Sequence, residues 1–188
     1  MNNQNSLYNY SNKQYNTVPK KLNQALLFVK PEFADNEELV NEVEEIIRNP
    51  KKYCKKLGIN LKPNYKVVET CYTTYSKELA AKHYAHLASK PFFGELVDYM
   101  GGEGKKVYGI IVEGDDNTIE ILRGIVGATK NALPGTIRHD IRVKYGYDLN
   151  DATRNVIHCS DSFDTAKQEI ALFRKTFEMQ NEDDIENA

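Results

Sequence analysis

Short apolar runs and stretches of helical periodicity alternate along this chain. Residues 25–29 form a continuous apolar run, which is typical of a buried strand. In Glu37–Arg48 the apolar residues recur every three or four positions and Asn49-Pro50 follows, so we expect an amphipathic helix that ends there. The same reasoning predicts further strands over residues 65–75, 107–112 and 156–157, and further helices over residues 77–88, 92–100 and 118–126.

The last predicted strand leads directly into another helix. Residues 156–157 should end a buried strand, and the hydroxyls and carboxylate of Ser160, Asp161 and Ser162 can cap the first free N–H groups of a helix. His158 is therefore expected at a strand-to-helix junction, where free N–H groups and the helix dipole favour anions. The helix itself is predicted by an apolar stripe at helical spacing: Phe163, Ala166, Ile170 and Phe173.

The order of these elements indicates a fold class. Strands and helices alternate as β-α-β-α-β-α-β, followed by a final helix, and no internal repeat is present. This order predicts an α+β domain, a small sheet that contains antiparallel strands and carries helices on one face.

His158 is the first candidate for chemistry. Glu169 lies far enough along the last helix for the chain to fold it back toward the histidine. A carboxylate on one ring nitrogen fixes the tautomer and leaves the other nitrogen as a nucleophile. The alternative is a histidine packed at a strand end, with Ser160 and Asp161 serving only as helix caps.

Cations and an aromatic pair supply the second set of candidates. Lys30 follows a buried strand directly, a position that presents a charge into a cleft, although a surface lysine at a turn is the common case. Arg123 and Arg138 could clamp a polyphosphate with two guanidinium forks, or could be two solvated arginines. Phe92 and Leu96 lie four residues apart on one helix face, which by default is a core stripe.

Composition narrows the class of protein. With 188 residues, of which 40% are apolar, we expect one domain at residues 21–177, a disordered Asn- and Tyr-rich extension at residues 1–20 and an acidic tail at residues 178–188. The formal charge of −2 gives no general attraction to nucleic acid or anionic membrane, and no segment could span a bilayer. Three widely spaced cysteines and the absence of a hydrophobic signal region favour a cytoplasmic location.

Five blocks of sequence follow one another along residues 24 to 174. They are Phe28-Val-Lys30-Pro31-Glu32, His83-Tyr84, Lys90-Pro-Phe92-Phe93, Arg123-Gly-Ile-Val-Gly-Ala-Thr129 with Pro134-Gly-Thr-Ile-Arg138, and Asn155-Val-Ile-His158-Cys-Ser160-Asp161-Ser162. In this order they resemble the nucleoside diphosphate kinase family. The resemblance implies a ferredoxin-like βαββαβ sandwich with a four-stranded antiparallel sheet covered by helices. It also implies transfer of the γ-phosphate of a nucleoside triphosphate to a nucleoside diphosphate through a phosphohistidine.

The resemblance also implies a role for each matching residue. His158 would be the nucleophile, Glu169 would orient its ring and Ser160 would hold Glu169. Stacking of the nucleobase would fall to Phe92, with Leu96 as its neighbour. Mg²⁺ would be held mainly by phosphate oxygens and water, with Asp161 nearby. The phosphates would be bound by Lys30, Tyr84, Arg123, Thr129 and Arg138. The ribose would be bound by Asn155 and, again, Lys30.

The same resemblance carries further expectations and one rival. Family members form hexamers or tetramers from a shared dimer, so a homo-oligomer is expected here, and the hydroxyl of Tyr84 is expected to meet the catalytic histidine. His83 and His86 are expected at the surface. Cys159 replaces a small residue, the segment 139–153 is longer, the loop 129–134 is shorter and the segment 49–64 is inserted. These departures are the only support for a nucleotide-binding regulatory relative without turnover. The acidic balance disfavours an RNA-binding domain of similar fold.

Overall fold

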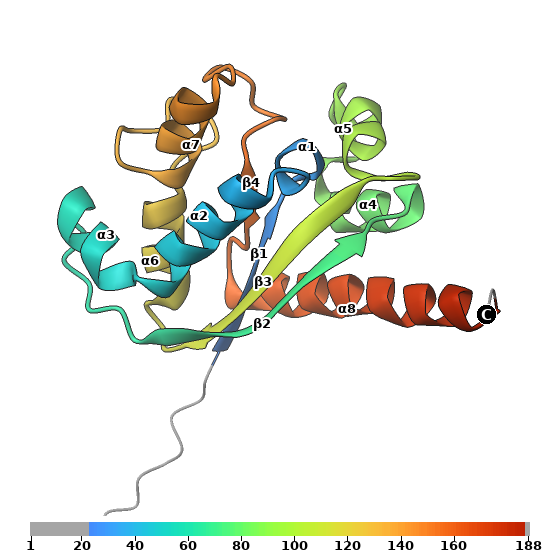
Figure 1. Ribbon diagram of the computed structural model, residues 1–188, viewed down its shortest axis with the longest axis horizontal. Helices are drawn as coiled ribbons and strands as arrows, with labels where there is room; N and C mark the ends of the chain where they lie inside the picture. The colour runs from blue at the N-terminus through green and yellow to red at the C-terminus, as the bar shows by residue number, and fades with distance from the viewer. Residues whose placement is uncertain (1–22, 187–188) are drawn as a thin grey trace, which may run out of the picture.

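The computed structural model describes the backbone of residues 23–186 and the side chains of residues 23–176. Four strands, β1 (Asn23–Val29), β2 (Tyr65–Thr74), β3 (Lys106–Gly114) and β4 (Ile157–Cys159), form one sheet in the order β2-β3-β1-β4 (Figure 1). Every neighbouring pair is antiparallel. The predicted α+β class and the ferredoxin-like arrangement are confirmed.

The helices follow the predicted pattern, with three additions. The helices over Glu37–Arg48 and Thr118–Val126 have the predicted bounds, whereas the helix expected over 77–88 stops at His83 and continues as a short 3-10 turn at Ala85–Leu87. The helices α1, α3 and α7 were not predicted. The full set is α1 (Pro31–Ala34), α2 (Glu37–Arg48), α3 (Pro50–Leu57), α4 (Lys77–His83), α5 (Phe93–Met100), α6 (Thr118–Val126), α7 (Ile137–Tyr145) and α8 (Phe163–Glu186).

Apolar side chains cover both faces of the sheet. On β1, Leu27 and Val29 join a cluster with buried residues of α2 and α6, whereas Leu26 and Phe28 join a second cluster with α4, α5 and α8. The two crossover helices α2 and α6 thus share one face, as a ferredoxin-like core requires. The expectation of helices on one face alone is wrong, because the inserted pair α4–α5 and the final helix cover the other face.

The segment 139–153, expected to be longer than in relatives, folds around a buried arginine. Arg142 on α7 has no exposed side-chain surface, and its Nη1 donates to the backbone carbonyls of Asp148, Leu149 and Asp151 at 3.0 to 3.2 Å. A charged side chain that is fully enclosed must be hydrogen-bonded in this way. Arg142 therefore holds the loop that leads from α7 back to β4.

Helix α8 packs against β1 and extends beyond the sheet (Figure 1), and a glycine on β3 gives it room. Gly109 on β3 faces the ring of Phe173, and a Cβ at position 109 would lie only 1.9 Å from the ring's Cζ. Phe173 and Ile170 are both buried in the second cluster. The bare backbone at Gly109 thus allows α8 to approach the sheet closely, which fixes the place of Glu169, one turn before Phe173.

The two predicted terminal segments fall at the edges of the described residues. Residues 1–20 lie outside the described residues. The backbone of α8 continues to Glu186, into the segment expected to be an acidic tail, but side chains beyond residue 176 are not described. Among the described residues, no helix has the length and apolar character needed to cross a lipid bilayer.

Candidate active site

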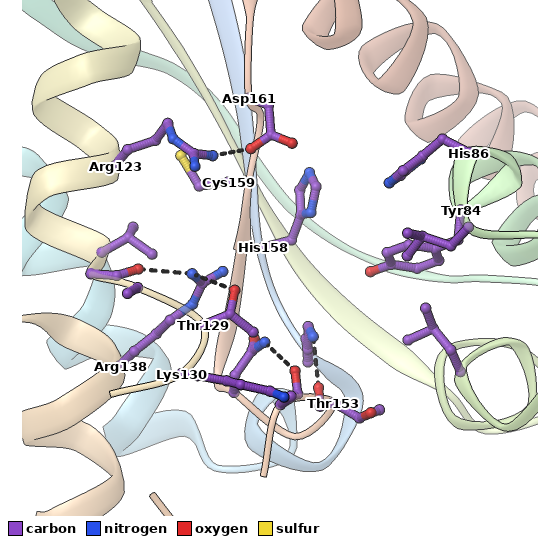
Figure 2. A pocket seen from close by; sticks show the side chains of 18 of the residues that line it. Tyr84, His86, Arg123, Thr129, Lys130, Arg138, Thr153, His158, Cys159 and Asp161 are labelled. Atoms are coloured by element: carbon purple, nitrogen blue, oxygen red, sulfur yellow. Dashed lines mark hydrogen bonds and ion pairs between the residues drawn. The ribbon is translucent and has the colours of Figure 1, made fainter. Parts of the chain in front are cut away.

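A cleft of about 940 Å³ opens between the α4–α5 pair and the α6–α7 pair, with β4 at its base (Figure 2). It contains eleven of the twelve residues singled out from the sequence, and the twelfth, Ser160, lies directly behind it. The eleven are Lys30, Tyr84, Phe92, Leu96, Arg123, Thr129, Arg138, Asn155, His158, Asp161 and Glu169. Segments that are far apart in the sequence thus meet in one place.

His158 had been expected just after the last strand, but it lies inside strand β4. It pairs across the sheet with Phe28, on whose ring it stacks at 4.6 Å between centroids and 15° between planes. Val156, two residues earlier, has a φ of 75°, which a β-branched residue rarely adopts, and its carbonyl accepts the backbone N–H of Lys30 at 2.8 Å. This left-handed residue delays the start of the strand, so that the histidine is held by sheet pairing.

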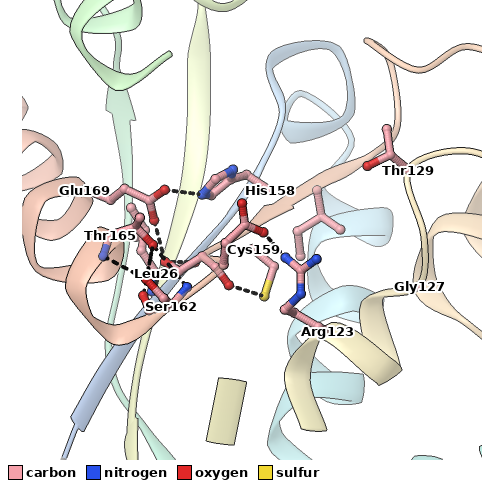
Figure 3. Close-up of polar contacts among 12 residues, drawn as sticks. Leu26, Arg123, Gly127, Thr129, His158, Cys159, Ser162, Thr165 and Glu169 are labelled. Atoms are coloured by element: carbon pink, nitrogen blue, oxygen red, sulfur yellow. Dashed lines mark hydrogen bonds and ion pairs between the residues drawn. The ribbon is translucent and has the colours of Figure 1, made fainter. Parts of the chain in front are cut away.

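A carboxylate fixes the histidine ring (Figure 3). Oε1 of Glu169 lies 3.2 Å from Nε2 of His158, and Oε2 accepts a hydrogen bond from the hydroxyl of Ser160. Ser160 is fully buried and also accepts the backbone N–H of Leu26. Burial would raise the pKa of Glu169, but the neighbouring His158 ring and the Ser160 hydroxyl lower this pKa to about 2. A permanently ionised carboxylate at Nε2 leaves Nδ1 as the ring nitrogen with a free electron pair.

Two cations and an amide form what we call the buried wall: Lys30, Arg138 and Asn155. Nζ of Lys30 donates to the carbonyl of Thr153 at 2.7 Å, and Nδ2 of Asn155 donates to that of Ala152 at 2.6 Å. Burial, assisted by the charge of Arg138, lowers the pKa of Lys30 to about 7. Each of these side chains is thus oriented by backbone carbonyls before any ligand arrives.

Arg138 is the most fully anchored member of the buried wall. Its guanidinium donates to the carbonyls of Gly127 and Ile157 at 2.8 Å each, and to the hydroxyl of Thr129 at 3.3 Å. Burial lowers its pKa to about 10, so the group stays charged at neutral pH. The contact with Thr129 places that hydroxyl beside the guanidinium at the cleft surface.

Phe92, Arg123 and Asp161 form what we call the open rim. Arg123 and Asp161 make an ion pair although half or more of each side chain is exposed. Phe92, the residue before α5, is 43% exposed, while Leu96, one turn later, is buried beside it. An exposed ring above an apolar neighbour is a flat surface that a planar ligand can cover.

Two predictions about the α4 end of the cleft need correction. The hydroxyl of Tyr84 points into the cleft (Figure 2), but it is buried without a hydrogen-bond partner among the described residues, and its ring centroid is 6.5 Å from that of His158. His83 is buried and not at the surface. The spacing of Leu79, Ala80 and His83 on α4 was the signal for this, since it places the histidine on the helix's buried stripe.

The structure also shows cleft residues that sequence reasoning missed. They come from the 3-10 turn after α4, from α6 and the loop that follows it, from the loop before β4 and from β4 itself. His86 had been expected only as a surface residue and Cys159 only as a departure from the family pattern, and the charge of Lys130 was the one further signal. Cys159, the residue that departs from the family pattern, is buried, and burial raises the pKa of its thiol to about 12. The thiol is therefore protonated and unreactive at neutral pH. The additional residues are His86, Leu87, Gly124, Val126, Gly127, Ala128, Lys130, Ala152, Thr153 and Cys159.

The cleft provides few ligands of its own for a divalent cation. Asp161 and Glu169 are the carboxylates that line it, and Glu169 is occupied by His158 and Ser160. Asp161 is exposed at the open rim. This donor set fits Mg²⁺ in one way, as an ion held mainly by the oxygens of a bound phosphate chain and by water, because Mg²⁺ keeps several waters when protein ligands are few.

A carboxylate-oriented histidine that faces a cleft with fixed cations is the arrangement of a phosphotransferase that uses a histidine nucleophile. Comparison with known proteins agrees. The family model "Nucleoside diphosphate kinase" matches residues 23–179. The chain is 42% identical over 120 residues to a nucleoside diphosphate kinase of Pyrococcus furiosus, covering 63% of this chain and 70% of the relative. It is 41% identical over 125 residues to the nucleoside diphosphate kinase of Macrococcus caseolyticus, covering 65% of this chain and 78% of the relative.

Solved structures give the same result for the fold. A halophilic nucleoside diphosphate kinase from Halobacterium salinarum, in complex with CDP, is 30% identical with a TM-score of 0.57, covering 80% of this chain and 86% of that one. The nucleoside diphosphate kinase of Encephalitozoon cuniculi is 25% identical with a TM-score of 0.59, covering 80% of this chain and 87% of that one.

This chain belongs to the nucleoside diphosphate kinase family. It is an enzyme that transfers the γ-phosphate of a nucleoside triphosphate to a nucleoside diphosphate, through the phosphohistidine that is general to the family.

Proposed function

We propose that Nδ1 of His158 accepts the γ-phosphate and returns it to the second nucleotide. The observation that carries this is the contact of Nε2 with Glu169, which leaves Nδ1 as the nucleophilic nitrogen. Nδ1 attacks the γ-phosphorus, the bond from phosphorus to the β–γ bridging oxygen breaks, and the nucleoside diphosphate leaves. In the second half-reaction, a terminal oxygen of another diphosphate attacks the phosphorus and Nδ1 departs.

Glu169 and Ser160 act on the ring and not on the substrate. The Ser160 hydroxyl has one hydrogen, and the ionised carboxylate is a stronger acceptor for it than the carbonyl of Leu26, which already accepts the backbone N–H of Ser160 at 3.0 Å. Glu169 thus keeps a proton on Nε2 and stabilises the positive charge that develops on the ring when Nδ1 is phosphorylated.

The cations bind and polarise the phosphate chain. Arg138 and Lys30 meet the transferring group, since charge in a phosphoryl-transfer transition state is spread over the phosphate oxygens. Arg123 exchanges its ion pair with Asp161 for a phosphate, and Thr129 and the Tyr84 hydroxyl donate hydrogen bonds. Asn155, whose Oδ1 has no partner among the described residues, and Lys30 hold the ribose hydroxyls.

Phe92 stacks on the nucleobase and Leu96 supports the ring. Stacking is indifferent to the identity of the base because every base has a π-face, so purine and pyrimidine nucleotides are both substrates. Mg²⁺ would be held by the phosphates and water with Asp161 nearby, and it would neutralise charge on the phosphate chain.

Assembly and location complete the proposal. We place the enzyme in the cytoplasm as a homo-oligomer, dimeric at least. Strand β2 is at the edge of the sheet and carries two exposed apolar side chains, Val68 and Tyr72, at 40% and 44%. An unpaired edge with apolar side chains is a surface that a second copy can cover. Light scattering that shows a monomer at micromolar concentration would contradict this.

One labelling experiment tests the catalytic proposal. Incubation with γ-labelled ATP and Mg²⁺, without acceptor, should leave acid-labile and base-stable label on the protein, and added GDP should discharge the label as GTP. His158→Gln should abolish labelling but retain nucleotide binding. His139→Gln, a change to a histidine outside the cleft, is the matched control and should label normally. Label that persists in His158→Gln would show that His158 is not the nucleophile.

A further inference from the structure

At the base of the cleft, three side chains bring metal-ligating atoms together. They are His83 on α4, His158 on β4 and Glu169 on α8, and one ligand atom from each lies within 4.8 Å of the others. Oε1 of Glu169 is 3.2 Å from Nε2 of His158 and 3.8 Å from Nε2 of His83. The two imidazole rings cross at 78° with centroids 4.8 Å apart. The carboxylate oxygen therefore lies close to both ring nitrogens.

His83 has no role in the proposed phosphate transfer, yet it is buried with neither ring nitrogen satisfied. Its side chain has no exposed surface, and neither Nδ1 nor Nε2 has a hydrogen-bond partner among the described residues. Aromatic rings surround it, including those of Phe28, Tyr75 and Tyr84. A buried polar group without a partner costs free energy, so its presence points to a ligand that it can bind.

The unpaired nitrogens of His83 suit a metal ligand. A neutral imidazole carries a free electron pair on one of its nitrogens, and this is the form in which histidine coordinates a metal. Neither nitrogen of His83 is engaged in a hydrogen bond among the described residues, so this electron pair is available to an ion.

We propose that His83, His158 and Glu169 form a binding site for Zn²⁺ that competes with phosphorylation of His158. Two imidazole nitrogens and one carboxylate oxygen are a common zinc ligand set, with a fourth position left for water. Ligand atoms of a tetrahedral zinc site lie about 3.3 Å apart, given zinc–nitrogen distances of about 2.0–2.1 Å. The present separations need small side-chain rotations to reach that value. Mg²⁺ is not the expected ion, because it prefers oxygen ligands.

Zinc binding should exclude phosphorylation. This expectation rests on the proposed role of His158 as the nucleophile. A neutral imidazole has one proton and one free electron pair. When Nε2 gives its pair to zinc, the proton must be on Nδ1, and Nδ1 then has no pair with which to attack phosphorus. Conversely, a phosphate on Nδ1 keeps the Nε2 proton facing Glu169. Each event therefore selects the tautomer that prevents the other.

The ion can reach the site through the nucleotide cleft. His158 and Glu169 both line the cleft, with 16% and 12% of their side chains exposed. The fourth position, on the cleft side, is filled by water. Bound nucleotide closes this route, so zinc acts on the empty enzyme.

The binding test uses the full-length protein without nucleotide. Zinc affinity is measured with a metal-buffered competitor, and coordination is followed by the visible absorbance of Co²⁺ in place of zinc. His83→Gln should lower zinc affinity at least about tenfold, because loss of even an outer-shell partner of a metal ligand costs about 10–100-fold. His86→Gln is the matched control, because His86 lies three residues further on and lines the cleft without belonging to the cluster. Its zinc affinity should be unchanged.

A labelling test on the same variants separates this proposal from the proposed function. With γ-labelled ATP and Mg²⁺, zinc should reduce labelling of the unmutated protein and of His86→Gln, and should lose this effect in His83→Gln. Phosphorylated enzyme should bind zinc at least about tenfold more weakly than free enzyme.

Each outcome has one meaning. Normal labelling with no zinc binding overturns the zinc site alone. Zinc binding that needs His83 in a protein that never labels overturns the role of His158 alone. Affinity that survives in His83→Gln but falls in His86→Gln places the metal elsewhere in the cleft and overturns the site. Circular dichroism of His83→Gln checks that the variant is folded. If it is not folded, the zinc affinities of the phosphorylated and the free unmutated enzyme are compared, which tests the same site without a mutation.

Discussion

The buried wall and the open rim both contain cationic side chains, but the wall holds its cations in fixed orientations and the rim does not. Arg138 in the wall donates to two backbone carbonyls and one hydroxyl, and Lys30 donates to another carbonyl. Arg123 at the rim has one exposed partner, the carboxylate of Asp161. The cations nearest the histidine are therefore oriented before substrate binds, while the outer cation must leave its partner to meet a phosphate.

This difference has a physical meaning for catalysis. Groups that are oriented in advance stabilise developing charge without the cost of reorganisation. Groups at an exposed edge can adapt to nucleotides of different shape, and water screens their contribution. The wall should determine the rate of phosphate transfer, and the rim should determine the affinity for the base and the outer phosphates of the nucleotide.

The strongest test of the comparison exchanges arginine for lysine in each region. Arg138→Lys should lower kcat/KM about 10²–10³-fold, because a single ammonium cannot reproduce the fork that meets both carbonyls and phosphate. Arg123→Lys should cost about tenfold or less, since the rim charge is retained. Steady-state kinetics with ATP and a fixed diphosphate measures both. Equal losses in the two variants would show that the wall has no special role.

A second test uses pH. Burial, together with Arg138, lowers the pKa of Lys30 to about 7, so the free enzyme loses this charge as pH rises above that value. Nucleotide affinity should fall between pH 7 and 9, by up to about tenfold per unit for a single group. Lys30→Met should bind more weakly and should show no such slope, whereas Arg123→Met should retain it. A slope that persists in Lys30→Met would assign the titration to another group.

The same lysine should affect stability in the opposite direction. Between pH 7 and 9, the unfolded chain keeps the Lys30 proton that the folded chain has lost, so the free energy of unfolding should rise with pH over this window. Lys30→Met should remove that rise. Urea unfolding of both proteins without nucleotide at several pH values measures the effect, and parallel curves would contradict it.

A smaller effect is expected from the aromatic residue of the rim. Phe92→Ala should raise KM by about fivefold, equivalent to about 1 kcal/mol of stacking on a half-exposed ring, and should leave kcat nearly unchanged. The increase should be similar for purine and pyrimidine diphosphates. A loss confined to one class of base would mean that Phe92 selects between bases.

The smallest effect concerns the ion pair of the rim. Asp161→Asn should change the free energy of unfolding by less than about 1 kcal/mol, because exposed pairs contribute little. Thermal unfolding at low and high salt measures it. A larger loss would show that Asp161 supports the fold and not only the rim.

The sequence predicted those features that depend on local pattern. Helices α2 and α6 have strong apolar periodicity and clear ends, and their bounds were predicted correctly. Helix α3 was missed because Asn49-Pro50 was interpreted only as the end of α2. The same proline also begins the next helix, at a position where its missing N–H is not needed.

Features that depend on contacts between distant segments were not predictable. The left-handed Val156 has no local sequence signal, since β-branched residues avoid this conformation. The buried environment of His83 and the loop around Arg142 arise from packing between elements. The residues of the cleft were identified through their resemblance to a family, whereas their division into wall and rim required the structure.

Gly109 shows that an absent side chain can limit how this enzyme changes. It does not line the cleft, yet any side chain at this position would meet the ring of Phe173 and press α8 away from the sheet. Glu169 would move with the helix, and the distance that keeps the proton on Nε2 of His158 would change. The basicity of the nucleophile can therefore be tuned from beneath the sheet, by the volume of one residue on β3, with every substrate contact left in place.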